Sequence, residues 1–176
     1  MANPVCLIAG AGPGTGGECA RRFASGGYRV AMLARNKERL DALEAEIQGS
    51  RGYVCDVSDL DGLMATAECV RDEMGAPEVV VHNAVSGILE GGGAAKFLED
   101  DPTRLERNFR VNTTSLLYLV RSTAPAMIEA GKGAIVVTGN TSATRGKPAF
   151  AYFAPTKAAQ RILCESMARD LGPKGV

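Results

Sequence analysis

The sequence is poor in several features that mark particular classes of protein. It has no tryptophan, a single histidine (His82) and no surplus of either charge, with 20 Lys and Arg residues against 20 Asp and Glu residues. A balanced chain of this kind gives no indication of a surface for nucleic acid or for an anionic membrane. No apolar run approaches the length that crosses a bilayer, and no basic and apolar leader precedes the first apolar run, which begins by Val5. We therefore expect a cytoplasmic globular protein that binds neither nucleic acid nor membranes.

Cysteine is present, but in no pattern that indicates a particular chemistry. The five cysteines are scattered along the chain without CxxC spacing: Cys6, Cys19, Cys55, Cys69 and Cys164. A structural metal site or a disulfide framework calls for regular spacing and, for disulfides, an even number. We expect reduced and mostly buried thiols, with no metal site.

The most informative stretch lies near the start of the chain. An apolar run, residues 5–9, is followed by five glycines between residues 10 and 17, and a helical pattern begins at once with Glu18. Glycine allows a positive φ and removes the Cβ that would keep a pyrophosphate away from the backbone. The first turn of the helix then offers unpaired N–H groups and the positive end of its dipole. This order predicts a phosphate cradle, and a glycine-rich surface turn is the alternative.

The rest of the chain alternates between strand and helix patterns. The expected strands are residues 5–9, 28–34, 52–55, 79–81 and 134–137, and the expected helices are residues 18–24, 35–47, 58–74, 102–130 and 149–171. The connection over residues 83–99, with three glycines at 91–93, is long enough to be functional or mobile. The alternation predicts a single α/β domain over residues 1–176, with a doubly wound parallel sheet and right-handed crossovers.

Capping and proline signals refine the expected helices. Ser58, with Asp61 three residues later, is typical of a capping box at the start of the third helix. Asp101 followed by Pro102 is typical of an N-cap with proline in the first turn. Pro125 is expected to kink the long helix that follows.

The residues after the second expected strand indicate the cofactor. About 20 residues past the glycines, an NAD site usually places an acidic residue that binds the ribose 2′-hydroxyl. This chain has Arg35 there, with Lys37 and Arg39 close behind. A guanidinium binds a 2′-phosphate through charge-assisted hydrogen bonds, whereas a carboxylate repels it. The sequence therefore predicts a preference for NADP(H) over NAD(H), and a solvated basic start of a helix is the alternative.

Five landmarks in the right order resemble the short-chain dehydrogenases/reductases. They are Gly10-x-x-x-Gly14-x-Gly16, Asp56-Val57, His82-Asn83-Ala84, Val111-Asn112, and Lys157 followed by Ala158-Ala159. The resemblance implies a Rossmann-type sheet of strand order 3-2-1-4-5. It implies a cofactor site formed by Gly10, Gly14, Thr15, Gly16, Arg35, Asp56, Val57, Asn83, Ala84 and Lys157. It also implies that Lys157 contacts the nicotinamide ribose and that Asn112 holds the helix of the site and a water.

The chain departs from the family pattern at its catalytic positions. Phe153 stands four residues before Lys157, where the family has its proton-donating tyrosine, and Asn140 falls on the family's serine position. Tyr152 lies about 100° away around a helix, so it cannot replace residue 153 without a shift of register. Tyr152, Ser142 or water remain possible proton donors, and Asn140 could bind a carbonyl. The only histidine, His82, is expected to be a structural imidazole.

Two further expectations follow from the resemblance. The sequence stops where the family begins its sixth strand, so the sheet is expected to lack the family's last two strands. In the family the two long helices, here residues 102–130 and 149–171, often form a subunit interface, so we expect a homo-oligomer.

These observations lead to two functional hypotheses. The first is an NADP(H)-dependent oxidoreductase that transfers hydride between nicotinamide and a carbonyl or alcohol, with Lys157, Asn112, Asn140 and Tyr152 as candidate catalytic residues. The second is an NADP(H)-binding protein with little or no catalysis, acting as a sensor or partner subunit.

Overall fold

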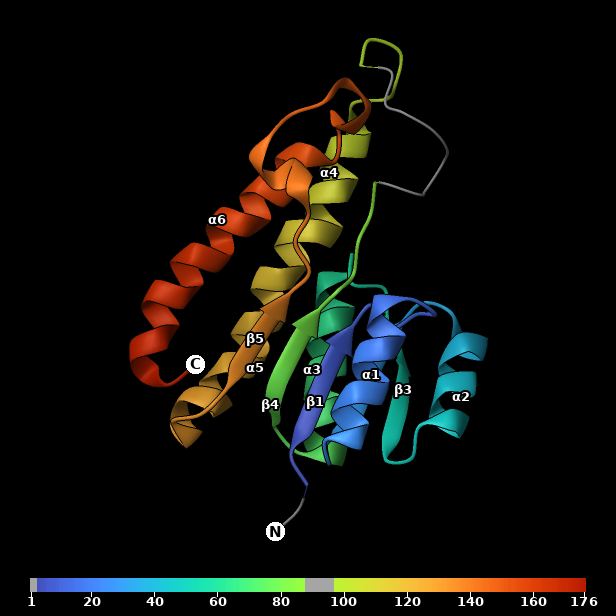
Figure 1. The fold of residues 1–176 in the computed structure, drawn as a ribbon, viewed down its shortest axis with the longest axis vertical. Helices are drawn as coiled ribbons and strands as arrows, with labels where there is room; N and C mark the ends of the chain where they lie inside the picture. Colours follow the sequence, from blue (N-terminus) through green and yellow to red (C-terminus); the bar gives the residue numbers. More distant parts are fainter. Residues whose placement is uncertain (1–2, 88–96) are drawn as a thin grey trace.

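The computed structural model describes residues 3–87 and 97–176, which form a five-stranded parallel sheet flanked by helices (Figure 1). The strands are β1 Val5–Ala9, β2 Arg29–Ala34, β3 Ser50–Val54, β4 Pro77–His82 and β5 Ala134–Val137. The α-helices are α1 Thr15–Ser25, α2 Lys37–Glu46, α3 Leu60–Met74, α4 Thr103–Phe109, α5 Ser115–Ala130 and α6 Ala154–Leu171. A π-helical segment, Arg110–Thr114, joins α4 to α5, and short 3-10 turns cover Thr141–Thr144, Pro148–Phe150 and Gly172–Lys174.

The sheet has the order β3-β2-β1-β4-β5 and every neighbouring pair of strands is parallel, which confirms the predicted fold class. The strand order reverses between β1 and β4, and ligands of such sheets bind at the carboxyl ends of the strands beside that reversal. The expected glycine-containing connection falls largely on residues 88–96, which lie outside the described part of the chain.

The uninterrupted apolar sequence of β1 is explained by helices on both faces of the sheet. Leu7 belongs to a core cluster with Leu63 of α3 and Leu119 of α5, whereas Ile8 belongs to a second cluster with Leu40 of α2. Alternate side chains of a strand point to opposite faces, so both sets must be apolar when both faces are covered. A third cluster, between α5 and α6, packs Leu116, Val120, Ala124 and Leu171 together. Within residues 3–87 and 97–176, no helix combines the length and apolar character needed to cross a membrane.

The start of α3 differs from the prediction. Asp59, not Ser58, is the N-cap, and its carboxylate accepts a hydrogen bond from Gly62 N. Ser58 instead donates both its backbone N–H and its hydroxyl to the Asp56 carboxylate. Because the Asp59 carboxylate already caps α3, Ser58 is not needed as the cap. Ser58 instead binds Asp56, in the segment that follows β3.

The long helix expected over residues 102–130 is divided. Its α-helical geometry is interrupted at the π-helical segment Arg110–Thr114, and Pro125 lies within α5. Asp101 accepts hydrogen bonds from the backbone N–H and hydroxyl of Thr103, the first residue of α4. Asn112 lies in the π-helical segment. Its side chain and its backbone carbonyl both accept hydrogen bonds from residues outside this segment, Ser86 and Gln160.

The last helix starts at Ala154, five residues later than predicted. Pro155 is in its first turn. Proline has no N–H to bond to the carbonyl four residues earlier, so it is tolerated at the beginning of a helix but not further inside. The preceding residues Pro148–Phe150 form a 3-10 turn.

Candidate nucleotide and catalytic site

The glycine stretch forms a tight turn between β1 and α1. Gly10 has φ +92°, and a Cβ at this position would lie 2.5 Å from the backbone nitrogen of Ala84. A Cβ on Gly16 would lie 2.3 Å from the carbonyl oxygen of Gly10. Apart from chain neighbours, no atom of the described residues comes within 4 Å of the Cβ positions of Gly12 and Gly14, so these residues leave the entrance to α1 open. The turn therefore brings the start of α1, with Gly14 as N-cap and Thr15 as first residue, against Gly10 and leaves room for an anion.

A hollow of about 290 Å³ opens at the carboxyl ends of β1 to β4. It contains six of the predicted cofactor residues: Gly10, Arg35, Asp56, Val57, Asn83 and Ala84. Several other residues that line it were not among the predicted cofactor residues, including Leu33, Asn36, Cys55, Ser86 and Val111. Most of them adjoin a predicted residue in the chain, so a wider window around each landmark would have found them. Val111 enters from the π-helical segment.

The hollow is basic at the end of β2. Arg35, Asn36 and Arg39 line this side, and the Asn36 carboxamide caps α2 by accepting from Arg39 N at 2.8 Å. This cap fixes the first turn of α2, which carries Arg39, against the hollow. Asp56 is the acidic residue of the lining, and its Oδ1 accepts from Ser58 N at 2.9 Å and Ser58 Oγ at 2.8 Å.

Two asparagines connect the strand ends to the rest of the site. Asn83 Nδ2 donates to Gly10 O at 2.9 Å, so the end of β4 is fixed to the glycine turn. The side chain of Asn112 is fully buried and makes three hydrogen bonds. Its Oδ1 accepts from Ser86 N at 2.9 Å, and its Nδ2 donates to Ser86 O at 3.0 Å and to Thr156 Oγ1 at 2.8 Å. Asn112 therefore joins the segment after β4 to the first turn of α6.

Lys157 does not line the hollow. Its side chain is buried, with 3% of the residue exposed, and Nζ donates to Thr138 O at 2.8 Å and to Gln160 Oε1. Gln160 Nε2 in turn donates to the backbone carbonyl of Asn112. The backbone carbonyl of Asn112 therefore binds the side chain of Gln160, a residue that no sequence pattern singled out, although its i, i+3 spacing from Lys157 places both on one helix face. Burial lowers the pKa of Lys157 to about 8.

Phe153, at the position of the family's catalytic tyrosine, and its neighbour Tyr152 are both buried, but they contact different parts of the structure. Phe153 is buried, with 2% exposed, and its ring lies 6.2 Å from that of Phe150 in an edge contact. Tyr152 is also buried, and its hydroxyl donates to the carbonyls of Phe97 at 3.1 Å and Asp100 at 3.3 Å. The Arg104 guanidinium lies over the Tyr152 ring, 5.6 Å from the ring centroid, in a cation–π contact. Tyr152 is therefore bound to the entry of α4, away from the residues that line the hollow.

Asn140 and Ser142 belong to the turn after β5. Asn140 Oδ1 accepts from Ser142 N at 2.9 Å and caps the 3-10 turn Thr141–Thr144. Asn140 itself is exposed. The hydroxyl of Ser142 is buried and has no hydrogen-bond partner in the part of the chain that the structure describes.

His82 is buried at the end of β4, and its Nε2 lies 2.8 Å from Ser115 Oγ. Ser115 donates its proton to Val111 O at 2.6 Å, so the imidazole must donate to Ser115 through Nε2–H. Burial, and secondly the Lys157 charge, lower the pKa of His82 to about 4. The ring is consequently neutral near pH 7.

A family model described as short chain dehydrogenase matches residues 4–176, and the chain belongs to this family. It is 30% identical over 180 residues to the oxidoreductase asL5 of Sarocladium schorii, an alignment that covers 100% of this chain and 69% of that protein. The chain spans about two thirds of the length of asL5 and of the 7alpha-hydroxysteroid dehydrogenase of Escherichia coli, and about half of the length of an uncharacterized oxidoreductase of Mycobacterium bovis.

Two solved structures share the fold and differ in cofactor. A metagenomic short-chain oxidoreductase in complex with NADP is 29% identical with a TM-score of 0.90, covering 100% of this chain and 80% of that one. NAD⁺-bound xylitol dehydrogenase is 29% identical with a TM-score of 0.89, covering 98% of this chain and 66% of that one. Overall similarity therefore does not choose between the two cofactors, and the choice depends on the residues of the hollow.

Proposed function

We propose that the protein is an NADP(H)-dependent oxidoreductase that interconverts a small carbonyl compound and its alcohol. The observation that carries the proposal is the hollow at the ends of β1 to β4, which is basic where β2 ends. The glycine turn beside it keeps Cβ atoms away from the entrance of α1, as a pyrophosphate requires. Arg35 and Arg39 then face the position of a 2′-phosphate.

Within this proposal each residue has a defined task. The cofactor supplies or accepts hydride when bound. Arg35 and Arg39 bind the 2′-phosphate, Asp56 and Val57 contact the adenine, and Asn83 and Ala84 line the adenosine side. Two of the three N–H groups of Lys157 donate hydrogen bonds, to Thr138 O and Gln160 Oε1. The third N–H is assigned to a ribose hydroxyl of the bound cofactor. Asn112 holds α6 and the segment after β4 in register for this contact.

The test is a calorimetric titration of the chain with NADPH and, separately, with NADH. Each charge-assisted hydrogen bond contributes about 1.5–3 kcal/mol, so NADPH should bind roughly 10- to 150-fold more tightly than NADH. Arg35→Gln should lower the affinity for NADPH about 10-fold and leave that for NADH unchanged. Arg22→Gln, which removes an exposed charge from the last turn of α1, is the matched control and should change neither. Equal or tighter binding of NADH by the unaltered chain would refute the preference.

A second function is favoured by the catalytic positions. Phe153 has no proton to donate, and the hydroxyl proton of Tyr152 is directed at the carbonyls of Phe97 and Asp100. An NADP(H)-binding protein with little or no turnover, serving as a sensor or partner subunit, fits these two observations. Such a protein would bind NADPH as above and reduce no carbonyl compound at a useful rate.

We also propose that the protein is a cytoplasmic homo-oligomer. Leu117 on α5 and Ile162 on α6 are exposed apolar side chains on the two long helices. A monomeric mass by light scattering at micromolar concentration would contradict association through these helices.

A further inference from the structure

A second hollow lies between the turn after β5 and the start of α6. It has a volume of about 350 Å³ and shares no lining residue with the nucleotide hollow. Polar and basic side chains line one part, Ser142, Thr144, Arg145 and Lys147, and Phe150 and Pro155 belong to the apolar part. Ala158, which follows Lys157 in a landmark of the family, also lines the hollow, but none of the polar and basic lining residues belongs to a landmark or lines the first hollow.

The Ser142 hydroxyl is a buried donor in a residue that lines this hollow. The residue is 5% exposed, and no described residue satisfies its Oγ, although the residue belongs to the wall of this hollow. A buried hydroxyl without a partner is unfavourable, and in native proteins such groups are almost always satisfied by protein, water or ligand. Less than 1 Å² of the Oγ surface is accessible, so a ligand in the hollow gains this hydrogen bond once the Ser142 side chain turns towards it.

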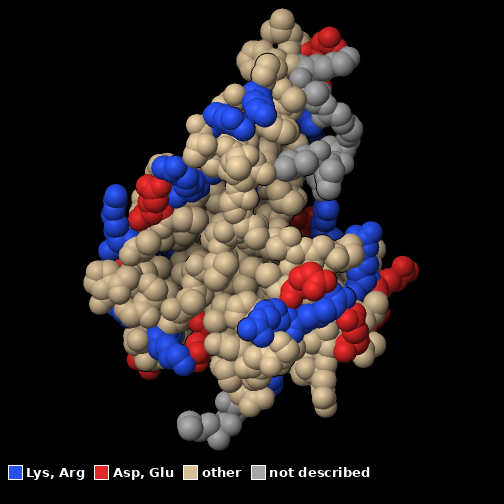
Figure 2. Space-filling model, viewed as in Figure 1, with Lys and Arg blue, Asp and Glu red and all other residues tan. Residues whose placement is uncertain are grey.

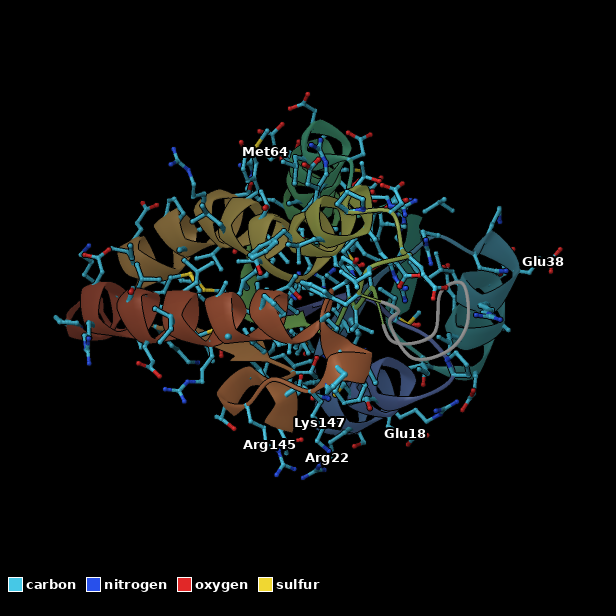
Figure 3. All side chains as sticks on the ribbon, turned by 90° about the horizontal axis from the view of Figure 1, so that it is seen from above. Glu18, Arg22, Glu38, Met64, Arg145 and Lys147 are labelled. Carbon is cyan, nitrogen blue, oxygen red and sulfur yellow. The ribbon has the colours of Figure 1, made fainter. Side chains whose placement is uncertain are left out.

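The charge around the hollow is of one sign. Arg145 and Lys147 are exposed, and neither forms an ion pair among the residues that the structure describes. No Asp or Glu belongs to the described lining. Figure 3 shows both side chains at the edge of the molecule, extending from the turn that precedes α6. On the face shown in Figure 2, blue basic atoms cover this turn.

The hollow adjoins the position at which the family presents its acid. Phe150 lines the hollow and its ring contacts that of Phe153, and Ala154, the next residue, also lines it. Phe150 and Ala154 therefore link the wall of this hollow to residue 153.

We propose that this hollow binds the anionic end, carboxylate or phosphate, of the carbonyl substrate. Ser142 Oγ donates a hydrogen bond to the anion, and Arg145 and Lys147 supply the positive charge. This assignment rests on the proposed function for the carbonyl group, whereas the anion site depends only on the second hollow.

The experiment is a calorimetric titration of the full chain, with and without NADP⁺, using two pairs of probes that differ in charge. Acetoacetate is compared with methyl acetoacetate, and dihydroxyacetone phosphate with dihydroxyacetone. At least one anion should bind about 10-fold more tightly than its neutral partner, as expected for charge-assisted hydrogen bonds at a partly exposed site. The pair that shows the preference identifies the anion as carboxylate or phosphate.

Variants separate a built site from general attraction to a basic surface. The double variant Arg145→Gln/Lys147→Gln should remove the preference, and Ser142→Ala should weaken anion binding several-fold without lowering the unfolding midpoint, because its hydroxyl has no partner to lose. Arg121→Gln removes an exposed charge on α5 that lines neither hollow, and it should have no effect.

Two outcomes would overturn the inference: equal binding of charged and neutral probes, or a charge preference that survives the double variant. Both leave the nucleotide proposal intact if NADPH binds. Conversely, anion binding by a chain that fails to bind NADPH would support the anion site and refute the proposed function.

Discussion

Replacing Asn112 tests whether the site is held together by one buried side chain. Asn112→Ala removes the acceptor of Ser86 N and the donor to Ser86 O and Thr156 Oγ1. Thr156 Oγ1 still donates to Phe153 O, so it loses only an incoming bond. The Ser86 N–H and C=O, however, lose the hydrogen bonds that the Asn112 side chain makes to them.

The magnitude follows from those two backbone groups. A buried polar group that loses its partner costs about 1–3 kcal/mol. Two such groups, with the small cavity left by the carboxamide, give roughly 4 kcal/mol. Because the whole free energy of unfolding of a domain is about 5–15 kcal/mol, this loss is a large fraction of the stability.

The assay is urea unfolding followed by circular dichroism, with NADPH titration of the folded variant. Asn36→Ala is the matched control for stability, because Asn36 makes a single capping bond at an exposed helix end and should lose only about 1 kcal/mol. A loss at position 112 no larger than that at position 36 would refute the reasoning. Retained NADPH affinity would show that the nucleotide hollow does not depend on the attachment of α6.

Two further predictions concern His82 and Phe153. The unfolded state binds a proton at His82 below pH 6.5, whereas the folded state binds it only near pH 4, so the stability contribution is complete above pH 6.5 and is lost as the pH falls between these values. The loss amounts to roughly 3 kcal/mol, and urea midpoints measured from pH 7 to 4 should show it for the unaltered chain and not for His82→Asn. Phe153→Tyr should raise NADPH-dependent carbonyl reduction about 100-fold or more if only the acid is absent, whereas Phe153→Leu should not. No gain with Phe153→Tyr, in a variant that still binds NADPH, would favour the function without turnover.

The fold and most of the residues that meet at the first hollow could be predicted because their signals are local. The burial of β1 on both faces can be predicted from its own residues, since apolar residues at every position of a short strand indicate helices on both faces of the sheet. Glycine at position 10 is likewise required by its own φ and by the approach of Ala84. The residue after β2 lies at the hollow because every parallel strand ends at the same edge of the sheet.

The second half of the site could not be predicted because its contacts join distant segments. The partners of Tyr152 are carbonyls of residues 97 and 100, and the partner of Lys157 is the carbonyl of residue 138. Backbone carbonyls are present at every residue, so no side-chain pattern identifies which of them accepts a bond. The buried position of Gln160, between Lys157 and Asn112, has the same cause.

These distant contacts also determine which residue can become a proton donor. Tyr152 precedes α6, whose first residue is Ala154, and a shift that brought it to the position of Phe153 would remove its hydroxyl from the Phe97 and Asp100 carbonyls. It would also displace the carbonyl of Tyr152, which accepts from Asn108 Nδ2 at 2.7 Å. Asn108 is itself fixed by Ser86, whose hydroxyl donates to Asn108 Oδ1 at 2.8 Å. Since several bonds oppose the shift, Tyr152 is better placed to hold α4 against α6 than to donate a proton, and Phe153→Tyr is the direct way to introduce a donor at this site.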